Sequence, residues 1–414
     1  MEQFEVIPEK IVFGGDGLAK LNGKNIFIPY SIPGEKVQIE ITKNTKDFDL
    51  AKITKIVEPS PFRVEPFCPF YQKCGGCNLQ HIQIEKQKEI RSSILKETFE
   101  RQGINVPEIE IISGNEKNYR CRVQLTDGGF SQKKSNEIIE LDHCPVATEE
   151  INDYLSKVEQ SSRPKSRVHV FGDKRVFSQS VGPFSHLKIA EESKTLSWET
   201  KTIGKSKKTP SNKVKQRFAG TLANENNNCT VTLCGKKIQF DVKGFFQSNL
   251  EVLEKTIKVL TKNFYGKNVI DMYAGSGTFS VFLADSFENI ILVEHNRDAL
   301  VNAEINLQGA KHETYGVSGA KWVKENAPFI QKNYGFIDAV VIDPPRSGME
   351  KEVNSWLCNN KVGQIRSVSC DPATHARDAK LLLDSGYTLT KLYLLDFYPQ
   401  TSHIESLAFF EYTE

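Results

Sequence analysis

The C-terminal third of the chain alternates strand-like and helix-like segments, and this alternation constrains the fold more than any other feature. An apolar strand leads into the glycine-rich turn YAGSGT, which opens a helix predicted over Phe279–Phe287. The strands predicted in this region are Lys267–Met272, Ile290–Val293 and Phe336–Ile342. Repeated strand–helix units favour a parallel, doubly wound sheet, whose ligand lies at the carboxyl ends of the strands. A last strand is predicted over His403–Tyr412.

The first turn of this region indicates which cofactor the sheet holds. DMYAGSG places glycines where a backbone must approach a ligand closely, and Glu294, seventeen residues after Gly277, is placed to bind a ribose diol. The dinucleotide pattern GxGxxG requires a third glycine, and that position is Ser280 here. The turn therefore favours S-adenosylmethionine over NAD.

A second candidate feature is VSCDPATHARD, residues 368–378, where Cys370 lies between a strand and a Pro-containing turn that opens a helix. A thiol at such a position is exposed, and the N–H groups of the following helix can acidify it. We therefore predict that Cys370 is a nucleophile. The alternative is a small buried hydrophobic residue, which describes most free cysteines.

Three cysteines within ten residues form a candidate metal site in CPFYQKCGGCNLQH, namely Cys68, Cys74 and Cys77. Glycines between them allow the backbone to fold round an ion. Cys144, in LDHCPVA, is the best candidate for a fourth ligand, and Cys121 is its rival. Spacing alone does not distinguish zinc from an iron–sulfur cluster, because both accept four thiolates.

Residues 1–59 contain short alternating runs separated by turns such as GGDG and SIPGE, which predicts a small all-β unit. The stretch GGDGLAKLNGKNIFIPYSIPGEKVQIEIT resembles the TRAM domain, an RNA-binding five-stranded barrel. The expected division is a TRAM-like barrel over 1–60, a central metal- and RNA-binding domain over 61–242, and a methyltransferase domain over 243–414. A helix predicted over Glu85–Gly103 is free to pack on the last of these despite its position in the chain.

Charge and composition bear on the partners of the protein and on its cellular compartment. The net charge of +2 neither requires nor excludes a nucleic-acid partner, but residues 161–217 carry fourteen Lys and Arg against four Asp and Glu. Within them, KTIGKSKKTPSNKVKQR is expected to be a mobile basic loop that either binds phosphates or is merely solvated. With no apolar run long enough to span a bilayer and no secretory signal, we expect a cytoplasmic protein without a membrane partner. Nine cysteines then indicate metal binding or catalysis rather than disulfides.

Taken together, the chain resembles the RNA uracil-5-methyltransferases of the RumA/TrmA type, nearly end to end. The resemblance rests on the TRAM-like start, the cysteine set and the segments FFQSN, DMYAGSGTFS, DPPRSGM, VSCDPATHARD and DFYPQTSHIES. It implies a class I, Rossmann-like S-adenosylmethionine-dependent methyltransferase domain, preceded by an OB-like TRAM barrel and a central α+β iron–sulfur domain. The family usually has Asn after the cysteine, where this chain has Asp371, and this difference bears on the hydrogen bonding and pKa of the thiol.

The resemblance also implies roles for individual residues. Cys370 is expected to be the nucleophile and Glu405 the general base. The expected ligands of a four-iron four-sulfur cluster are Cys68, Cys74, Cys77 and Cys144, and the expected contacts to the methyl donor are Gln247, Tyr273, Glu294 and Asp343. Arg346 either contacts a substrate phosphate or pairs with a carboxylate, and His403 is expected to be structural.

The implied reaction is transfer of a methyl group to carbon 5 of a uridine in RNA, through a transient bond between a cysteine and the uracil ring. The combination of cluster and TRAM-like unit favours 23S rRNA as the substrate, with tRNA as the alternative. A different class of function is a non-catalytic RNA-binding or ribosome-assembly protein. We expect the protein to act as a monomer.

Overall fold

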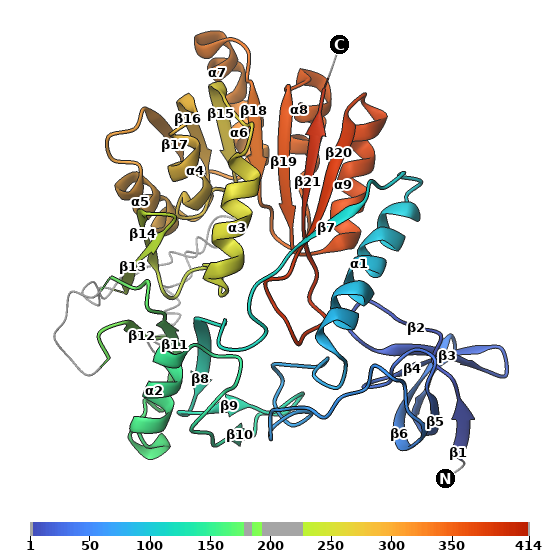
Figure 1. The fold of residues 1–414 in the computed structure, drawn as a ribbon. Helices are drawn as coiled ribbons and strands as arrows, with labels where there is room; N and C mark the ends of the chain where they lie inside the picture. Colours follow the sequence, from blue (N-terminus) through green and yellow to red (C-terminus); the bar gives the residue numbers. More distant parts are fainter. Residues whose placement is uncertain (1–2, 178–183, 193–226, 413–414) are drawn as a thin grey trace, which may run out of the picture.

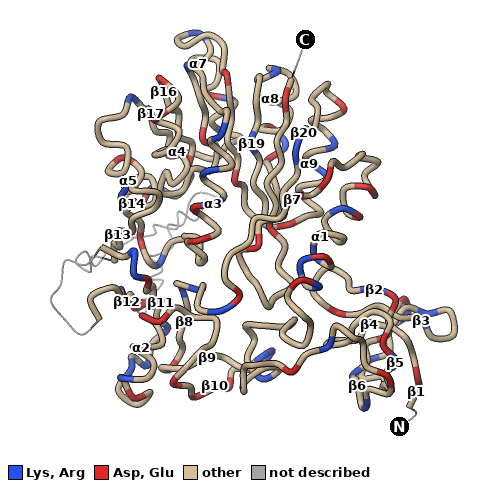
Figure 2. Tube along the Cα trace, viewed as in Figure 1, with Lys and Arg blue, Asp and Glu red and all other residues tan. Residues whose placement is uncertain are grey.

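The structure is a computed structural model that describes residues 3–177, 184–192 and 227–412. The predicted basic loop, KTIGKSKKTPSNKVKQR, lies outside the described residues. Figure 1 shows a large sheet flanked by helices, and two smaller β-containing parts on the side to which the carboxyl ends of its parallel strands point. Basic and acidic residues are interspersed along the described chain (Figure 2).

The N-terminal part is a six-stranded sheet with the order β1-β5-β6-β4-β3-β2. Its strands are β1 (Gln3–Val6), β2 (Lys10–Ile11), β3 (Gly17–Leu21), β4 (Lys24–Ile28), β5 (Lys36–Asn44) and β6 (Phe48–Glu58). Alternate apolar side chains such as Ile26, Ile28 and Ile39 point inward and are fully buried. The sequence predicted a five-stranded barrel, and the sixth strand is the two-residue β2, which is too short to produce an alternating pattern.

The central part contains a three-stranded antiparallel sheet with the order β12-β11-β8, against which α2 packs. A short hairpin of β9 and β10 lies beside it, and the hairpin of β13 and β14 leads toward the large sheet. The elements are β8 (Arg122–Thr126), β9 (Phe130–Ser131), β10 (Ile138–Ile139), α2 (Glu149–Lys157), η1 (Gln160–Ser162), β11 (Arg167–Gly172), β12 (Leu187–Glu191), β13 (Asn228–Leu233) and β14 (Lys236–Asp241).

The large sheet has eight strands in the order β17-β16-β15-β18-β19-β21-β20-β7. They are β7 (Ile109–Ile112), β15 (Gly266–Met272), β16 (Phe287–Val293), β17 (His312–Tyr315), β18 (Ala339–Ile342), β19 (Gln364–Ser369), β20 (Thr388–Leu395) and β21 (Glu405–Glu411). The strands from β17 to β19 are parallel, as predicted. However, β21 runs antiparallel between β19 and β20, because the connection from β20 to β21 contains no helix to return the chain to the opposite edge. The strand at one edge of the sheet, β7, pairs with β20 and comes from the segment that the sequence assigned to the central domain.

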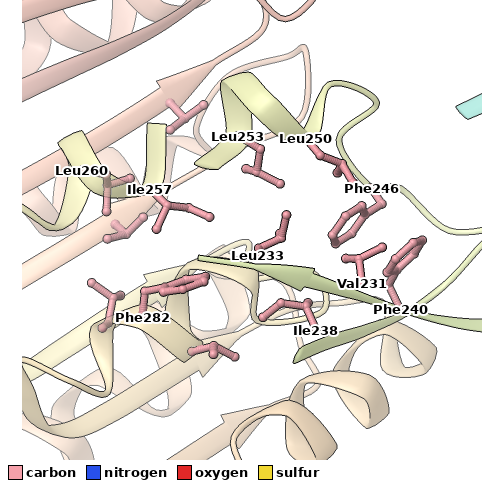
Figure 3. Packing of buried hydrophobic residues seen from close by; sticks show 14 of the residues in the cluster. Val231, Leu233, Ile238, Phe240, Phe246, Leu250, Leu253, Ile257, Leu260 and Phe282 are labelled. Carbon is pink, nitrogen blue, oxygen red and sulfur yellow. The ribbon is translucent and has the colours of Figure 1, made fainter. Parts of the chain in front are cut away.

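Helices cover both faces of the large sheet, so successive side chains of a strand enter different clusters. Val269 packs in the cluster under α3, α4 and α5, whereas Ile270 packs in the cluster under α1 and α6 to α9. Figure 3 shows Leu253 and Ile257 of α3 packing toward Leu233 of the β13–β14 hairpin. The helices are α1 (Ile84–Glu100), α3 (Leu250–Thr261), α4 (Thr278–Leu283), α5 (Arg297–Asn306), α6 (Gly319–Glu325), α7 (Ala327–Tyr334), α8 (Lys351–Asn360) and α9 (Pro372–Asp384).

Of two predicted helices, one is shorter in the structure and the other packs on the catalytic domain. The helix predicted to end at Phe287 ends at Leu283, because Phe287 already begins β16. The helix predicted over Glu85–Gly103 is α1, which packs on α9 and β20. No helix among the described residues is long and apolar enough to cross a membrane.

The connection between β20 and β21, residues 396–404, is tied to α1 by buried polar contacts. The backbone N–H of Gln400 donates to Oε1 of Gln87 at 3.0 Å, and Nε2 of Gln87 donates to Oε1 of Gln400 at 2.9 Å. Nη1 of Arg91 lies 2.7 Å from Oδ1 of Asp396, and both side chains are only 1% exposed. The connection that leads into β21 is therefore held in place by α1.

We expect Asp396→Ala to destabilise the protein by about 3–5 kcal/mol, because Arg91 would remain buried and charged without its partner. The effect should appear as a lowered melting temperature. Glu100→Ala is the matched control: its partner Lys96 lies at 3.8 Å and both side chains are at least half exposed, so the expected change is within about 0.5 kcal/mol. Equal melting temperatures for the two variants would contradict the role given to the buried pair.

Candidate active site

Four of the predicted site residues follow the carboxyl ends of neighbouring parallel strands. Tyr273 follows β15, Glu294 follows β16, Asp343 follows β18 and Cys370 follows β19. The last residues of β15 and β18, Met272 and Ile342, are paired in register. The predicted residues are therefore assembled along one edge of the sheet, as expected for a doubly wound fold.

Glu405 reaches the same edge from the opposite direction. Because β21 is antiparallel to β19 and Ser369 pairs with Ser406, Cys370 and Glu405 occupy the next opposing positions. Gln247, in the segment between β14 and α3, completes this group: its Nε2 lies 3.5 Å from Oε2 of Glu405, at the limit of a hydrogen bond.

The carboxyl group of Glu405 is poised near neutral pH. Its side chain is buried, with 5% of the residue exposed, and burial raises its pKa to about 8. The negative charge of Asp343 raises this pKa further, whereas the Gln247 hydrogen bond and the guanidinium of Arg346 oppose the rise. Burial also raises the pKa of Asp343 to about 7. Carboxyl groups with such raised pKa values are suited to accept and release protons.

The thiol of Cys370 is not acidified in this structure, contrary to the expectation from its position before a helix. Burial, together with the charges of Glu405 and Asp343, raises its pKa to about 11, and Arg346 only partly offsets this. The helix donors are engaged elsewhere: Oδ1 of Asp371 accepts the N–H groups of Ala373 and Thr374 at 3.0 and 2.9 Å. Pro372 has no N–H group to donate.

The glycine-rich turn beside this group has the geometry of a ligand cradle. Tyr273 has a φ of +66°, which is strained for a residue with a bulky side chain, and its hydroxyl accepts the N–H of Glu350 at 3.2 Å. A side chain at Gly275 would meet nothing within 4 Å, so the space beside the turn is open. Glu294 faces the turn and accepts the N–H groups of Gly275 at 2.9 Å and Asn296 at 2.7 Å. The open space and the oriented carboxylate fit a ribose-bearing methyl donor.

Asp271, near the end of β15, also holds the glycine-rich turn in place. Asp271 is 1% exposed, and its Oδ2 accepts the hydroxyl of Ser280 at 2.6 Å and its N–H at 3.1 Å. Burial raises the pKa of Asp271 to about 7. This carboxyl group therefore joins the end of β15 to the start of α4 and fixes the turn between them.

All nine cysteines are free in the structure. Among the residues that the structure describes, no three Cys, His, Asp or Glu side chains converge closely enough to hold a metal ion. The four predicted ligands are nevertheless neighbours. Burial raises the pKa of the Cys77 and Cys144 thiols; the charge of Cys144 adds to the rise at Cys77, and the charges of Cys68 and Cys74 add to the rise at Cys144. By contrast, the thiol of Cys121 is completely buried and donates to the carbonyl of Ser248 at 3.2 Å.

Sequence reasoning assigned no role to Tyr398 or to Arg120, which lie near the catalytic group. The ring of Tyr398 has the guanidinium of Arg120 over it at 5.8 Å, and the charge of Glu405 acts on its hydroxyl. Arg346, for which the sequence left two roles open, acts electrostatically on both Cys370 and Glu405. The sequence gave no sign that Tyr398 and Arg120 lie together, because they come from connections far apart in the chain.

Comparison with known proteins agrees with this geometry. The family described as tRNA (Uracil-5-)-methyltransferase matches residues 83–412, and the one described as tRNA (uracil(54)-C(5))-methyltransferase, TRAM domain, matches residues 5–62. An RNA methyltransferase of Treponema denticola is 35% identical, with 99% of each chain covered. The 23S rRNA (uracil(1939)-C(5))-methyltransferase RlmD of Shewanella sediminis is 31% identical, with 96% of this chain and 93% of that protein covered.

A solved structure has the same overall fold. It is the tRNA (uracil-54, C5)-methyltransferase of Pyrococcus abyssi in complex with S-adenosyl-L-homocysteine, with a TM-score of 0.69 and 23% identity. The match covers 98% of this chain and 100% of that one. The chain therefore belongs to the tRNA (uracil-5-)-methyltransferase family, whose members use S-adenosylmethionine to methylate carbon 5 of uridine in RNA.

Proposed function

We propose that this enzyme methylates a uridine of 23S rRNA, with Cys370 as the nucleophile and Glu405 as the general base. The observation that carries the proposal is the opposition of these two residues across β19 and β21, beside the donor cradle. The relatives named as 23S rRNA enzymes match this chain over nearly its whole length, which favours rRNA as the substrate.

The chemistry accounts for both residue types. Carbon 5 of uracil is a poor nucleophile, so the thiolate of Cys370 first bonds to carbon 6 and makes an enolate whose carbon 5 can attack. S-adenosylmethionine, when bound, supplies the electrophilic methyl group. The carboxylate of Glu405 then removes the proton from carbon 5. The electrons of that C–H bond restore the C5–C6 double bond while the bond from Cys370 to carbon 6 breaks.

The surrounding residues set the charge state of this pair. An ionised Glu405 opposes ionisation of Cys370, so a neutral Glu405 favours the attacking thiolate, whereas an ionised Glu405 is required later as the base. Arg346 favours both ionised forms. We propose that Gln247, Tyr273, Glu294 and Asp343 orient the methyl donor and the uracil ring beside the thiol.

The RNA must present its uridine outside a helical stack, because the ring has to meet the thiol and the methyl donor together. The N-terminal unit, residues 1–60, and the central unit, residues 61–242, are proposed to grip the flanking RNA. The protein is proposed to act as a monomer, with residues 243–414 carrying most of the catalytic domain.

The test is methylation of two transcripts, a 23S rRNA fragment and a tRNA, followed by mass-spectrometric mapping of 5-methyluridine. We expect product in the 23S rRNA fragment. If 5-methyluridine forms only in the tRNA, the substrate is tRNA, and the mechanism is unchanged. Binding of RNA without product in either transcript, with S-adenosylmethionine present, would instead indicate a non-catalytic RNA-binding protein.

We further propose that Cys68, Cys74, Cys77 and Cys144 hold a four-iron four-sulfur cluster, with zinc as the alternative. The electrostatic influence of these thiols on one another supports this set. Burial raises the pKa of Cys68, Cys77 and Cys144, and binding of a metal would displace the protons that these three thiols retain. The methylation needs no electron transfer, so the proposed role is to organise the fold or to bind RNA. Asn78, directly after Cys77, donates its N–H to the carbonyl of Gln400 at 3.1 Å and so links this segment to the connection before Glu405. The cytoplasm, which keeps thiols reduced, suits such a site.

We expect anaerobically purified protein to contain iron and sulfide and to absorb visible light broadly. Cys144→Ala should lose the iron and the absorption, because three thiolates hold a cluster less firmly than four. Cys121→Ala is the matched control and should keep both. Zinc without visible absorption would favour the alternative metal, and full iron content in Cys144→Ala would contradict the proposed ligand set.

A further inference from the structure

A pocket with a volume of about 230 Å³ lies where three distant segments meet, next to the connection that leads into β21. One wall is the turn Gly14–Gly15–Asp16, a second is the Gly75–Gly76 turn between two of the cysteines, and a third is the β9–β10 turn with Lys133 and Lys134. Its remaining side is formed by residues 401–403, which end two residues before Glu405. The pocket contains neither Cys370 nor Glu405, but Cys77, one of the proposed cluster ligands, is among its lining residues.

Hydrogen bonds and close contacts between these walls fix the shape of the pocket. Nδ2 of Asn78 donates to the carbonyl of Gly14 at 3.0 Å and to Oγ of Ser402 at 2.9 Å. A Cβ added at Gly15 would lie 2.6 Å from Nδ2 of Asn78 and 2.9 Å from Cβ of Ser402. The N–H of Lys133 donates to the carbonyl of Lys73 at 2.8 Å, which fixes the hairpin turn against the cysteine segment.

Asp16 provides a hydrogen-bond acceptor on the wall of this pocket. Its side chain is half-buried, and among the residues that the structure describes its carboxylate makes no hydrogen bond and no ion pair. Burial raises its pKa, and the charges of Lys133 and Lys134 oppose that rise. The oxygens of this carboxylate are not sealed off from solvent, so they are free to accept hydrogen bonds from a ligand that enters the pocket.

The other side chains of the pocket suit a nucleotide. Lys133 and Lys134 are exposed and leave ammonium protons free for a phosphate, although Nζ of Lys133 also donates to the hydroxyl of Tyr30 at 2.8 Å. Tyr30 also lines the pocket; Nζ of Lys133 lies 4.6 Å from the centre of its ring, and the ring packs edge-on against Tyr71 and His81. Arg346 and Arg120 add positive charge near His403, on the side of the catalytic group. Cations, an aromatic ring and an unpaired acceptor together match a phosphate and a base with an amino group.

We propose that this pocket holds an unstacked nucleotide of the RNA substrate, a near neighbour of the target uridine. Lys133 and Lys134 bind its phosphate, and Asp16 accepts hydrogen bonds from the amino group of an adenine, guanine or cytosine. This rests on the proposed function, because it assumes that RNA reaches Glu405 past residues 401–403. It adds a determinant of which uridine the enzyme selects.

The first experiment measures binding of a fluorescent RNA hairpin that copies the 23S rRNA segment around the target uridine, as a function of salt. For Lys133→Ala/Lys134→Ala we expect about tenfold weaker binding at low salt. The slope of log K against log salt should also fall by about 1.4, as for two lost phosphate contacts on single-stranded RNA. The matched control is Lys324→Ala/Lys332→Ala, which removes two exposed lysines from α6 and α7, and should bind as the wild type does.

The second experiment tests base recognition with hairpins that lack one base at a time on either side of the target. For the wild-type protein, one such hairpin should bind about tenfold more weakly than the complete one, as expected for a stacked and recognised base. In Asp16→Ala that penalty should shrink, whereas penalties at other positions stay unchanged. Asp47→Ala, at an exposed position of the same N-terminal unit, should retain the wild-type pattern.

The outcomes separate the two proposals. If the wild-type protein makes no 5-methyluridine but the pocket variants still weaken binding, the proposed function fails and the pocket stands. If the wild-type protein methylates RNA and the Lys133/Lys134 and Asp16 variants match their controls in affinity, salt slope and base penalties, the pocket does not bind a nucleotide.

Discussion

Cys370→Ala is expected to abolish formation of 5-methyluridine, because without the thiolate bond to carbon 6 the ring never becomes nucleophilic at carbon 5. Removing a covalent nucleophile in another enzyme lowers kcat by roughly 10⁶-fold, so activity should fall below detection. The measurement is methyl transfer to RNA, combined with an assay for a covalent complex on 5-fluorouridine-containing RNA. With fluorine at carbon 5 there is no proton for Glu405 to remove, so the wild-type protein should remain bonded to the RNA.

The matched control for this change is Cys358→Ala, which removes another partly buried free thiol, on α8. It should retain both methyl transfer and the covalent complex. A wild-type protein that methylates RNA but leaves no adduct on Cys370 with the fluorinated substrate would overturn the mechanism. Unchanged binding of RNA by Cys370→Ala would show that the variant is folded.

Glu405→Gln is expected to stop the reaction one step later. The thiol can still add and the methyl group can still be transferred, but no carboxylate is present to remove the proton from carbon 5. Turnover should fall by about 10²–10⁴-fold, the usual contribution of a general base. Unlike Cys370→Ala, this variant should accumulate a methylated RNA–protein adduct on unmodified uridine, visible on a denaturing gel.

The pH dependence gives an independent check on Glu405. Its pKa of about 8 lies above the ordinary value of 4.5, so the basic form is scarce at pH 6 and increases as pH rises through 8. Release of the product from the adduct should therefore quicken with pH in the wild-type protein and level off above 8. The slow release in Glu405→Gln should lack this step. An identical pH profile in both proteins would show that another group removes the proton.

The surroundings of Cys370 show what the sequence predicted correctly about this thiol and what it did not. The motif identified the thiol at the end of a strand, and its place there is borne out by β19 and α9. Its expected acidification was wrong, because burial raises the pKa of the thiol, two carboxyl groups near the sulfur add to the rise, and the Asp371 side chain caps the helix donors. Charges contributed by other segments determine a pKa, and local sequence does not contain them.

The sequence alone was sufficient for the strands predicted at Lys267–Met272, Ile290–Val293 and Phe336–Ile342, the glycine-rich turn and the residues at their ends. Apolar periodicity and turn chemistry are local properties, which is why these predictions succeeded. Only the tertiary structure placed β21 antiparallel beside β19, and so brought Glu405 opposite Cys370 from a distant part of the chain. It also brought Asp16, Gly75 and Lys133 round one pocket. The physical reason is that pairing of distant strands and packing of separate units depend on the whole buried surface, which no single stretch of residues encodes.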